Sequence, residues 1–171
     1  LSEPRFSGGS LYWLEGRPSE RGRVVIMRRG SDGAVADVMA YPLSARSRVH
    51  EYSGGAYSPY RDTVFFSEDA SQRLYRVNGL EQARAITLES GPPGSIRYGD
   101  ATIAPDGGCL VAVREVHHED QEATNDLVVI STDGGEPPRS LISGRDFYSF
   151  PRFSPDGRQL LWTTWDHPQM P

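Results

Sequence analysis

The sequence lacks several features that are typical of particular classes of protein, and each absence argues against one class. Cys109 is the one cysteine among 171 residues, so no internal disulfide can form. This is compatible with a reducing cytoplasm, where we expect the protein to be located. Apolar runs such as "RVVIM" are far shorter than the roughly 20 residues of a membrane helix, so we expect no membrane partner. The start, "LSEPRFSGG", lacks the basic and apolar regions of a signal peptide and reads as a cut inside a longer chain or as a mature start.

Basic charge and helical periodicity are also scarce. Lysine and arginine together number 18 against 23 aspartates and glutamates, which gives a net charge of -5. Nucleic-acid-binding proteins usually carry a basic face, so we expect no nucleic-acid partner. Apolar residues at helical spacing are hard to find. "LEQARAITL" (80–88) comes nearest, and we interpret it as a turn followed by a strand.

What the chain has instead is turn chemistry. Its 18 glycines and 13 prolines lie in clusters, with short β-branched and aromatic runs between them. Many short strands separated by such turns are typical of an all-β protein. With 37% hydrophobic residues, the chain can bury the core of one domain.

The turns recur along the chain. "SPYRD" (58–62), "APDGG" (104–108) and "SPDGR" (154–158) follow one another at intervals of 46 and 50 residues, and apolar strands follow each of them. Proline sets the first corner of a tight turn, aspartate caps it, and glycine takes the left-handed position. Four antiparallel strands in each such unit are typical of a β-propeller blade. We therefore predict a partial β-propeller.

The predicted propeller is incomplete. It forms a single domain over residues 1–171, with about three four-stranded blades and the start of a fourth. A propeller closes with about 4 to 8 blades, so the chain would be an arc of a larger ring. We expect its exposed end blades to drive homo-oligomerisation, because open sheet edges associate. The predicted blades span residues 6–46, 52–90, 98–144 and 147–171.

Several segments carry a resemblance to a known family. They are "YWLEGRPSERGRVVIMRR" (12–29), "VHEYSGGAY" (49–57), "RLYRV" (73–77), "RYGDATIAPDGGCLVAVRE" (97–115) and "SGRDFYSFPRFSPDGRQLLWTTWDHPQMP" (143–171). Together they resemble the N-terminal propeller of bacterial prolyl oligopeptidase-family serine peptidases, nearest to the acylaminoacyl-peptidase or dipeptidyl-aminopeptidase type. Ser53 departs from the family's "HEYGGG" pattern, and serine would be strained there if the position requires a positive φ.

The resemblance implies a two-domain enzyme. The propeller would be a lid over a C-terminal α/β-hydrolase domain, its partner, and would restrict access to short peptide substrates. The nucleophile of such a domain stands in G-x-S-x-G, and Ser10 and Ser53 each match that pattern on one side only. We therefore expect no catalytic residue and no cofactor in this chain.

Two stretches hold candidate functional residues. "EVHHEDQEATND" (115–126) gathers imidazoles and carboxylates, which suit zinc or similar ions. Adjacent histidines at the end of a strand point to opposite sides, so we favour a solvated loop and predict no metal. The family resemblance adds a third interpretation, in which His117 and His118 touch substrate or the hydrolase domain.

The second stretch is "VHEYSGG" (49–55). His50 and Glu51 could act in acid–base chemistry or bind a peptide amino terminus. We favour a structural role, in which Tyr52 packs between blades and His50 hydrogen-bonds a neighbouring loop, while Arg97 supplies ion pairs on the same face.

Three functions follow from these observations. The first is a non-catalytic, substrate-gating propeller of a serine peptidase. The second is a free-standing, TolB-like interaction module, because such propellers carry similar "SPDG" repeats. The third is an independent enzyme, which only the histidine and glutamate residues favour. The candidate gating or interface residues are His50, Glu51, Tyr52, Arg97, His117 and His118.

Overall fold

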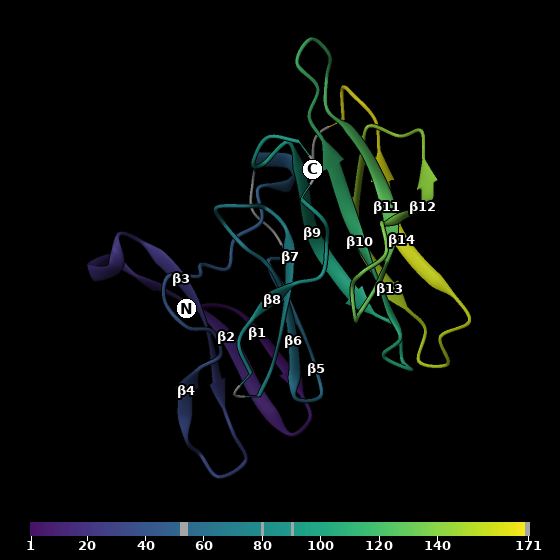
Figure 1. Cartoon of the computed structure of the whole chain (residues 1–171). Coiled ribbons are helices and arrows are strands. Elements are labelled where there is room, and N and C mark those ends of the chain that lie inside the picture. Colours follow the sequence, from purple (N-terminus) through teal and green to yellow (C-terminus); the bar gives the residue numbers. More distant parts are fainter. Residues whose placement is uncertain (52–54, 80, 90, 170–171) are drawn as a thin grey trace.

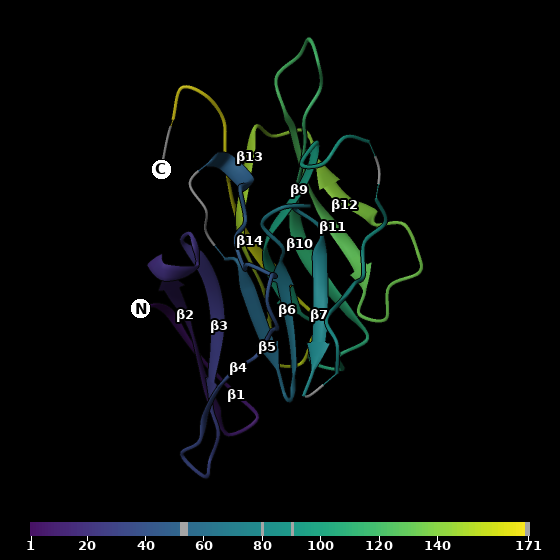
Figure 2. The same ribbon diagram turned by 60° about the vertical axis from the view of Figure 1, so that its left-hand side comes forward.

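The computed structural model describes residues 1–51, 55–79, 81–89 and 91–169. In this part of the chain the regular structure is strand, apart from two short 3-10 helices, η1 (Pro18–Glu20) and η2 (Val49–Glu51). None of the described helices is long and apolar enough to cross a membrane. The sheets stand side by side along an arc (Figures 1 and 2).

The strands form three four-stranded antiparallel sheets and one two-stranded sheet. In each sheet the strands lie in the order in which the chain makes them, as in a propeller blade. This confirms the predicted partial β-propeller of about three blades and the start of a fourth. The sheets are β1 (Ser2–Ser7), β2 (Ser10–Arg17), β3 (Arg23–Arg29) and β4 (Val35–Asp37); β5 (Tyr57–Tyr60), β6 (Thr63–Ser67), β7 (Leu74–Asn78) and β8 (Arg84–Ala85); β9 (Ile96–Ile103), β10 (Cys109–Val116), β11 (Thr124–Ser131) and β12 (Arg139–Ser143); β13 (Phe147–Phe153) and β14 (Leu160–Trp165).

The first sheet begins earlier than the predicted first blade. Its strand β1 starts at Ser2 rather than near residue 6, because "SEPRFS" pairs with β2, with Ser2 opposite Leu14. The outermost strands of the first two sheets are short, since β4 has three residues and β8 has two. The segment 80–88 thus holds a short strand, as its sequence indicates.

The Pro-Asp-Gly turns form as their sequence predicts. In the third sheet, the amide of Gly107 donates to the carbonyl of Ala104 at 2.8 Å, and Gly107 has a φ of 81°. The carboxylate of Asp106 accepts from the amide of Gly108 at 2.9 Å, which caps the turn. The fourth sheet repeats this turn at Gly157, whose φ is 71°. Glycine suits these positions because a side chain is strained at positive φ.

The hydrophobic core lies between sheets rather than within one sheet. One cluster joins the first two sheets, a second joins the second and third, and a third joins the third and fourth. Phe66, Leu110 and Tyr148 are among the fully buried members of these three clusters. Each sheet therefore depends on its neighbours to cover its faces, as expected for repeated blades.

The first strands of successive sheets contact one another, β1 with β5, β5 with β9, and β9 with β13. Three of them carry a bulge at a residue in the left-handed region: Glu3 in β1, Asp100 in β9 and Phe150 in β13, with φ of 50°, 53° and 52°. Such φ values are uncommon outside glycine. The carboxylate of Asp100 accepts from the amide of Phe150 at 2.6 Å, so the bulges of neighbouring sheets are joined directly.

Candidate functional site

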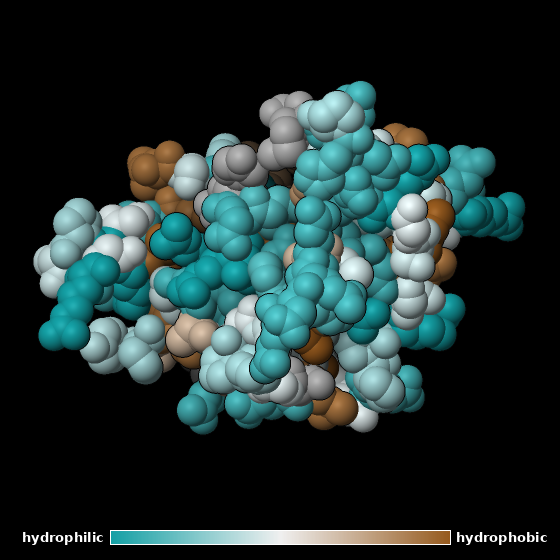
Figure 3. Space-filling view, turned by 90° about the horizontal axis from the view of Figure 1, so that it is seen from above, coloured by the Kyte–Doolittle hydropathy of each residue, from teal (hydrophilic) through white to brown (hydrophobic). Residues whose placement is uncertain are grey.

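The described site residues lie on the same face of the arc, at the ends of the strands that are uppermost in Figure 1. The helix η2, which precedes the second sheet, lies there beside the start of β9 and the loop between β10 and β11 (Figures 1 and 2). Viewed from this end, the surface is mostly hydrophilic (Figure 3). Segments that lie far apart in the sequence therefore meet on one polar face.

Glu115 is the centre of this group. Its side chain is only 5% exposed, at the end of β10. One carboxylate oxygen accepts hydrogen bonds from Nη1 of Arg97 at 3.2 Å and from Nε2 of His117 at 2.6 Å. The other oxygen accepts from the backbone amide of His50 at 2.9 Å. A buried carboxylate requires such partners, because an unpaired buried charge is very costly. We call His50, Glu51, Arg97, Glu115 and His117 the Glu115 cluster.

Arg97 links the cluster to the segment that leads into the second sheet. It stands opposite Glu115 in the β9–β10 pairing. Its Nη1 also donates to the carboxylate of Glu51 and to the carbonyl of Arg48, the latter at 2.9 Å. The hydrogen bond from Arg97, together with its charge, lowers the pKa of Glu51 below its usual value. Glu51 is nevertheless 71% exposed, so its carboxylate is presented to solvent.

His50 is held between two sheets. Its Nε2 lies 3.0 Å from the carbonyl oxygen of Tyr148, and because a carbonyl only accepts, Nε2 carries the hydrogen. Nδ1 is then an acceptor, and it is buried with no hydrogen-bond partner among the described residues. The ring packs against Phe147 and Trp165, with centroids 5.2 and 5.9 Å away. This burial lowers the pKa of His50, and the nearby charge of Glu115 opposes that shift.

The backbone of η2 is unusual at the two candidate residues that it carries. His50 and Glu51 both adopt left-handed conformations, with φ of 55° and 64°. Non-glycine residues with these values are held in place by their surroundings and often occur at functional sites. Here the amide of His50 is bound by Glu115 and the carboxylate of Glu51 by Arg97. The cluster therefore fixes the direction in which Glu51 points.

The two adjacent histidines separate, as expected at a strand end. His117 bonds to Glu115, whereas Nε2 of His118 lies 3.1 Å from the hydroxyl of Thr124 on an exposed loop. One carboxylate oxygen or imidazole nitrogen from each of Glu51, Glu115 and His117 lies within 4.8 Å of the others, a spacing that could suit a metal ion. Arg97, however, already donates to both carboxylates, so its positive charge occupies the place of a cation. The arrangement favours an ion-pair cluster.

The comparisons with known proteins bear on the whole chain. No protein-family model and no curated protein matches it. Among solved structures, a puromycin-hydrolyzing peptidase from Mycobacterium tuberculosis is 33% identical over 99% of this chain, with a TM-score of 0.92. Puromycin hydrolase is 30% identical over 98% of this chain, with a TM-score of 0.87. Both are prolyl oligopeptidase-family peptidases. This chain is a β-propeller segment of the prolyl oligopeptidase family.

The match covers only part of those relatives, since this chain spans 28% of the length of each. TolB from Acinetobacter baumannii also matches, with a TM-score of 0.67 and 14% identity, over 98% of this chain and 38% of TolB. That likeness shows the propeller fold alone. The family assignment therefore rests on the two peptidases.

Sequence reasoning missed the central residue of the candidate site. Glu115 is the first residue of "EVHHED" (115–120), but the residues predicted from this stretch were the neighbouring histidines. The Pro-Asp-Gly turn alone does not predict this pairing, because the register beside the turn, with Leu110 opposite Ile103, would place Val116 opposite Arg97. The bulge in β9 shifts the pairing by one residue and brings Glu115 opposite Arg97 instead. The role of the Tyr148 carbonyl had no signal in the sequence either. Tyr52 and Ser53 lie outside the described residues.

Gly55 shows why this family segment needs glycine after η2. It has a φ of 57°, and its carbonyl accepts from the amide of Asp100 at 2.9 Å. A Cβ atom added there would lie 2.5 Å from the Cα of Asp100, a distance that backbone atoms cannot accept. The close approach of the two sheets behind the Glu115 cluster therefore depends on Gly55.

Proposed function

We propose that this chain is the substrate-gating, non-catalytic part of a peptidase that hydrolyses short peptides or acyl-peptides. Its partner would be an α/β-hydrolase domain of the same parent protein. The observation that carries this proposal is the 33% identity with a puromycin-hydrolyzing peptidase over 99% of the chain, of which the chain covers 28%. The remaining length of such a protein accommodates a catalytic domain.

The Glu115 cluster supports the gating role. It links η2 to the third sheet through Glu115 and Arg97, and to the fourth sheet through the Tyr148 carbonyl, all on one polar face. Relative movement of these elements would break the hydrogen bonds of His50 to Glu115 and Tyr148 and leave the buried carboxylate with one partner fewer, which is costly. Glu51 and His118 remain exposed on the same face, where they could meet an entering peptide.

A free-standing, TolB-like interaction module is the second candidate. It is favoured by the propeller fold shared with TolB, at 14% identity. The higher identity of the peptidases over the same residues favours the gating role.

A chimaeric enzyme tests the proposal. This chain replaces the matching segment of the Mycobacterium tuberculosis peptidase, and hydrolysis of puromycin and of peptides of increasing length is measured. We expect the chimaera to hydrolyse puromycin and to discriminate against long peptides. A folded but inactive chimaera would mean that this chain does not fit a hydrolase domain, which favours the interaction module.

A variant then separates gating from a merely structural role. Glu115→Ala removes the centre of the cluster, so we expect the ratio of kcat/KM for short over long peptides to fall about tenfold, a change worth roughly 1.4 kcal/mol. The kcat for the shortest substrate should stay the same. Glu122→Gln, an exposed residue of the neighbouring loop, is the matched control. An unchanged length ratio in a folded Glu115→Ala chimaera would contradict gating by this cluster.

A further inference from the structure

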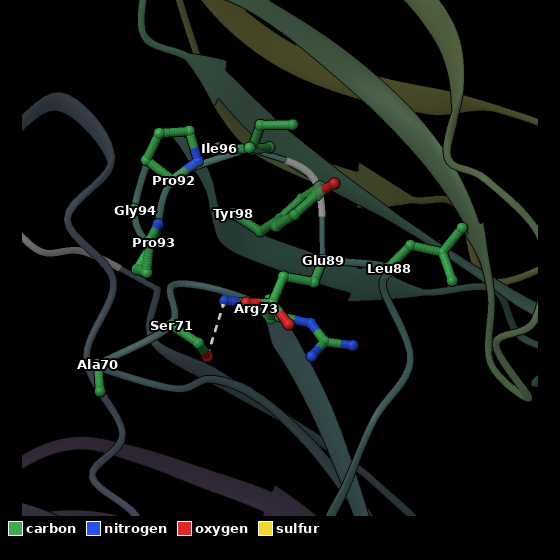
Figure 4. Close-up of a pocket in the computed structure, with 11 residues that line it drawn as sticks. Ala70, Ser71, Arg73, Leu88, Glu89, Pro92, Pro93, Gly94, Ile96 and Tyr98 are labelled. Atoms are coloured by element: carbon green, nitrogen blue, oxygen red, sulfur yellow. Dashed lines mark hydrogen bonds between the residues drawn. The ribbon is translucent and has the colours of Figure 1, made fainter.

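A pocket lies between the second and third sheets, beside β9. Its volume is about 250 Å³. Figure 4 shows Pro92 and Ile96 on one side of it and Ser71 and Arg73 on the other. Because side chains alternate along a strand, Ile96 and Tyr98 line this pocket while Arg97 between them serves the Glu115 cluster.

The pocket combines apolar walls with two opposite charges. The walls come from Leu88, Ile96, the ring of Tyr98 and the prolines at 92–93. Arg73 and Glu89 also line it. Small-molecule sites have this composition, with mostly apolar walls and a few placed polar groups.

Arg73 and Glu89 each keep side-chain atoms that can still form hydrogen bonds with a ligand. Nε and Nη2 of Arg73 donate to the carbonyl of Thr87, which leaves Nη1 without a hydrogen bond among the described residues. Within the same part of the chain, the carboxylate of Glu89 makes no hydrogen bond, and no ion pair joins it to Arg73. A single cation and a single anion thus line one small pocket without neutralising each other.

We propose that this pocket binds a free amino acid with an apolar side chain, such as leucine. The carboxylate of the ligand accepts from Nη1 of Arg73, and its ammonium group pairs with Glu89. The side chain lies against Ile96 and the proline walls, where burial of apolar surface contributes to affinity. A longer peptide fits less well, because an internal residue lacks one or both of the charges that the pocket complements.

Free amino acids are also products that a peptidase releases. A ligand bound in this pocket would therefore signal to the propeller that product is present. That consequence rests on the proposed function, whereas the binding itself does not. Direct binding to the isolated chain therefore distinguishes the two, since it involves no hydrolysis.

The test is a titration of the 15N-labelled chain followed by two-dimensional NMR. We expect L-leucine to cause saturable shifts at the amides of Arg73, Glu89 and Ile96. Leucinamide lacks the carboxylate, N-acetyl-leucine lacks the ammonium group, and glycine lacks the apolar side chain. Each should bind at least about tenfold more weakly than L-leucine, since each loses one of the three contacts.

Variants locate the site. Glu89→Gln should weaken L-leucine binding about tenfold and leave N-acetyl-leucine binding unchanged, because only the former has an ammonium group. Glu81→Gln, in the exposed β7–β8 connection, is the matched control and should bind as the unmodified chain does. A dispersed spectrum shows that each variant folds. Absence of saturable shifts with L-leucine, or equal binding of leucine and its two blocked derivatives, would overturn the proposal.

Discussion

The first two seams between sheets are built differently. An apolar cluster that includes Phe66 and Tyr57 fills the seam between the first and second sheets. The seam between the second and third sheets has an apolar cluster too, but it adds buried serine hydroxyls that donate to carbonyls of β9. Two of these, from Ser47 and Ser67, meet at the carbonyl of Tyr98, at 2.9 and 2.6 Å.

The difference concerns how exactly two sheets are positioned. Apolar contacts are not directional, so they hold sheets together without setting a single register. A buried hydroxyl must keep its hydrogen bond, which fixes donor and acceptor relative to each other. The seam with the serines is the one that ends in the Glu115 cluster. Hydroxyls of Tyr12 and Tyr57 also donate to carbonyls across the first seam, but among the described residues only the second seam directs two serine hydroxyls to one carbonyl.

The largest effect is expected from breaking the apolar seam. Phe66→Ala removes a fully buried ring, and we expect the free energy of unfolding to fall by about 3–5 kcal/mol. Urea denaturation measures this. Phe6→Ala, which truncates a phenylalanine that is 81% exposed, is the control and should change stability by less than about 0.5 kcal/mol. Equal losses in the two variants would mean that the first seam is not the apolar core described.

The serine seam should give a smaller and coupled effect. Ser47→Ala and Ser67→Ala each remove one donor from the Tyr98 carbonyl, so we expect about 1 kcal/mol of destabilisation each. The double variant deprives that carbonyl of both serines and should differ from the sum by about 0.5 kcal/mol or more. Ser140→Ala on the exposed strand β12 is the control. Strict additivity would show that the two hydroxyls do not share an acceptor.

The smallest effect concerns the exposed ion pair of Glu51 with Arg97. We expect Glu51→Gln to lower the free energy of unfolding by less than about 1 kcal/mol at neutral pH, because solvent screens the pair. Arg97 lowers the pKa of Glu51 from its usual 4.5, so the stabilisation is present above that pH. It is lost as the pH falls through the lower pKa of the folded state.

Urea midpoints of Glu51→Gln and the unmodified chain, compared at neutral pH and at several values below pH 4.5, measure this loss. The gap between the two proteins should close on acidification. Glu119→Gln, on the exposed β10–β11 loop, should show no such gap. A gap that widens in acid would contradict the assignment of Arg97 as the partner of Glu51.

The two kinds of seam also mark how far sequence reasoning reaches. The turns at Gly107 and Gly157 were predicted because a Pro-Asp-Gly turn is decided by neighbouring residues. The arc of blades followed from their repetition. The Glu115 cluster was only partly predicted, since Arg97 and His50 were named but Glu115 was not. Its formation requires the docking of η2 against a sheet whose residues lie far along the chain.

Left-handed backbone at His50 and Glu51 shows the same limit. Neither residue type indicates such a conformation in the sequence, and tertiary contacts impose it. By contrast, the separate directions of His117 and His118 could be predicted, because alternation along an extended chain is a local property.

The placement of the hydrophobic core between sheets has an evolutionary consequence. Copying the gene segment for one sheet adds that sheet and one new seam, while every other seam keeps its contacts. Deleting a sheet removes a seam in the same way. Arcs of this kind can therefore change length by whole sheets, with stability that grows or shrinks roughly in equal steps.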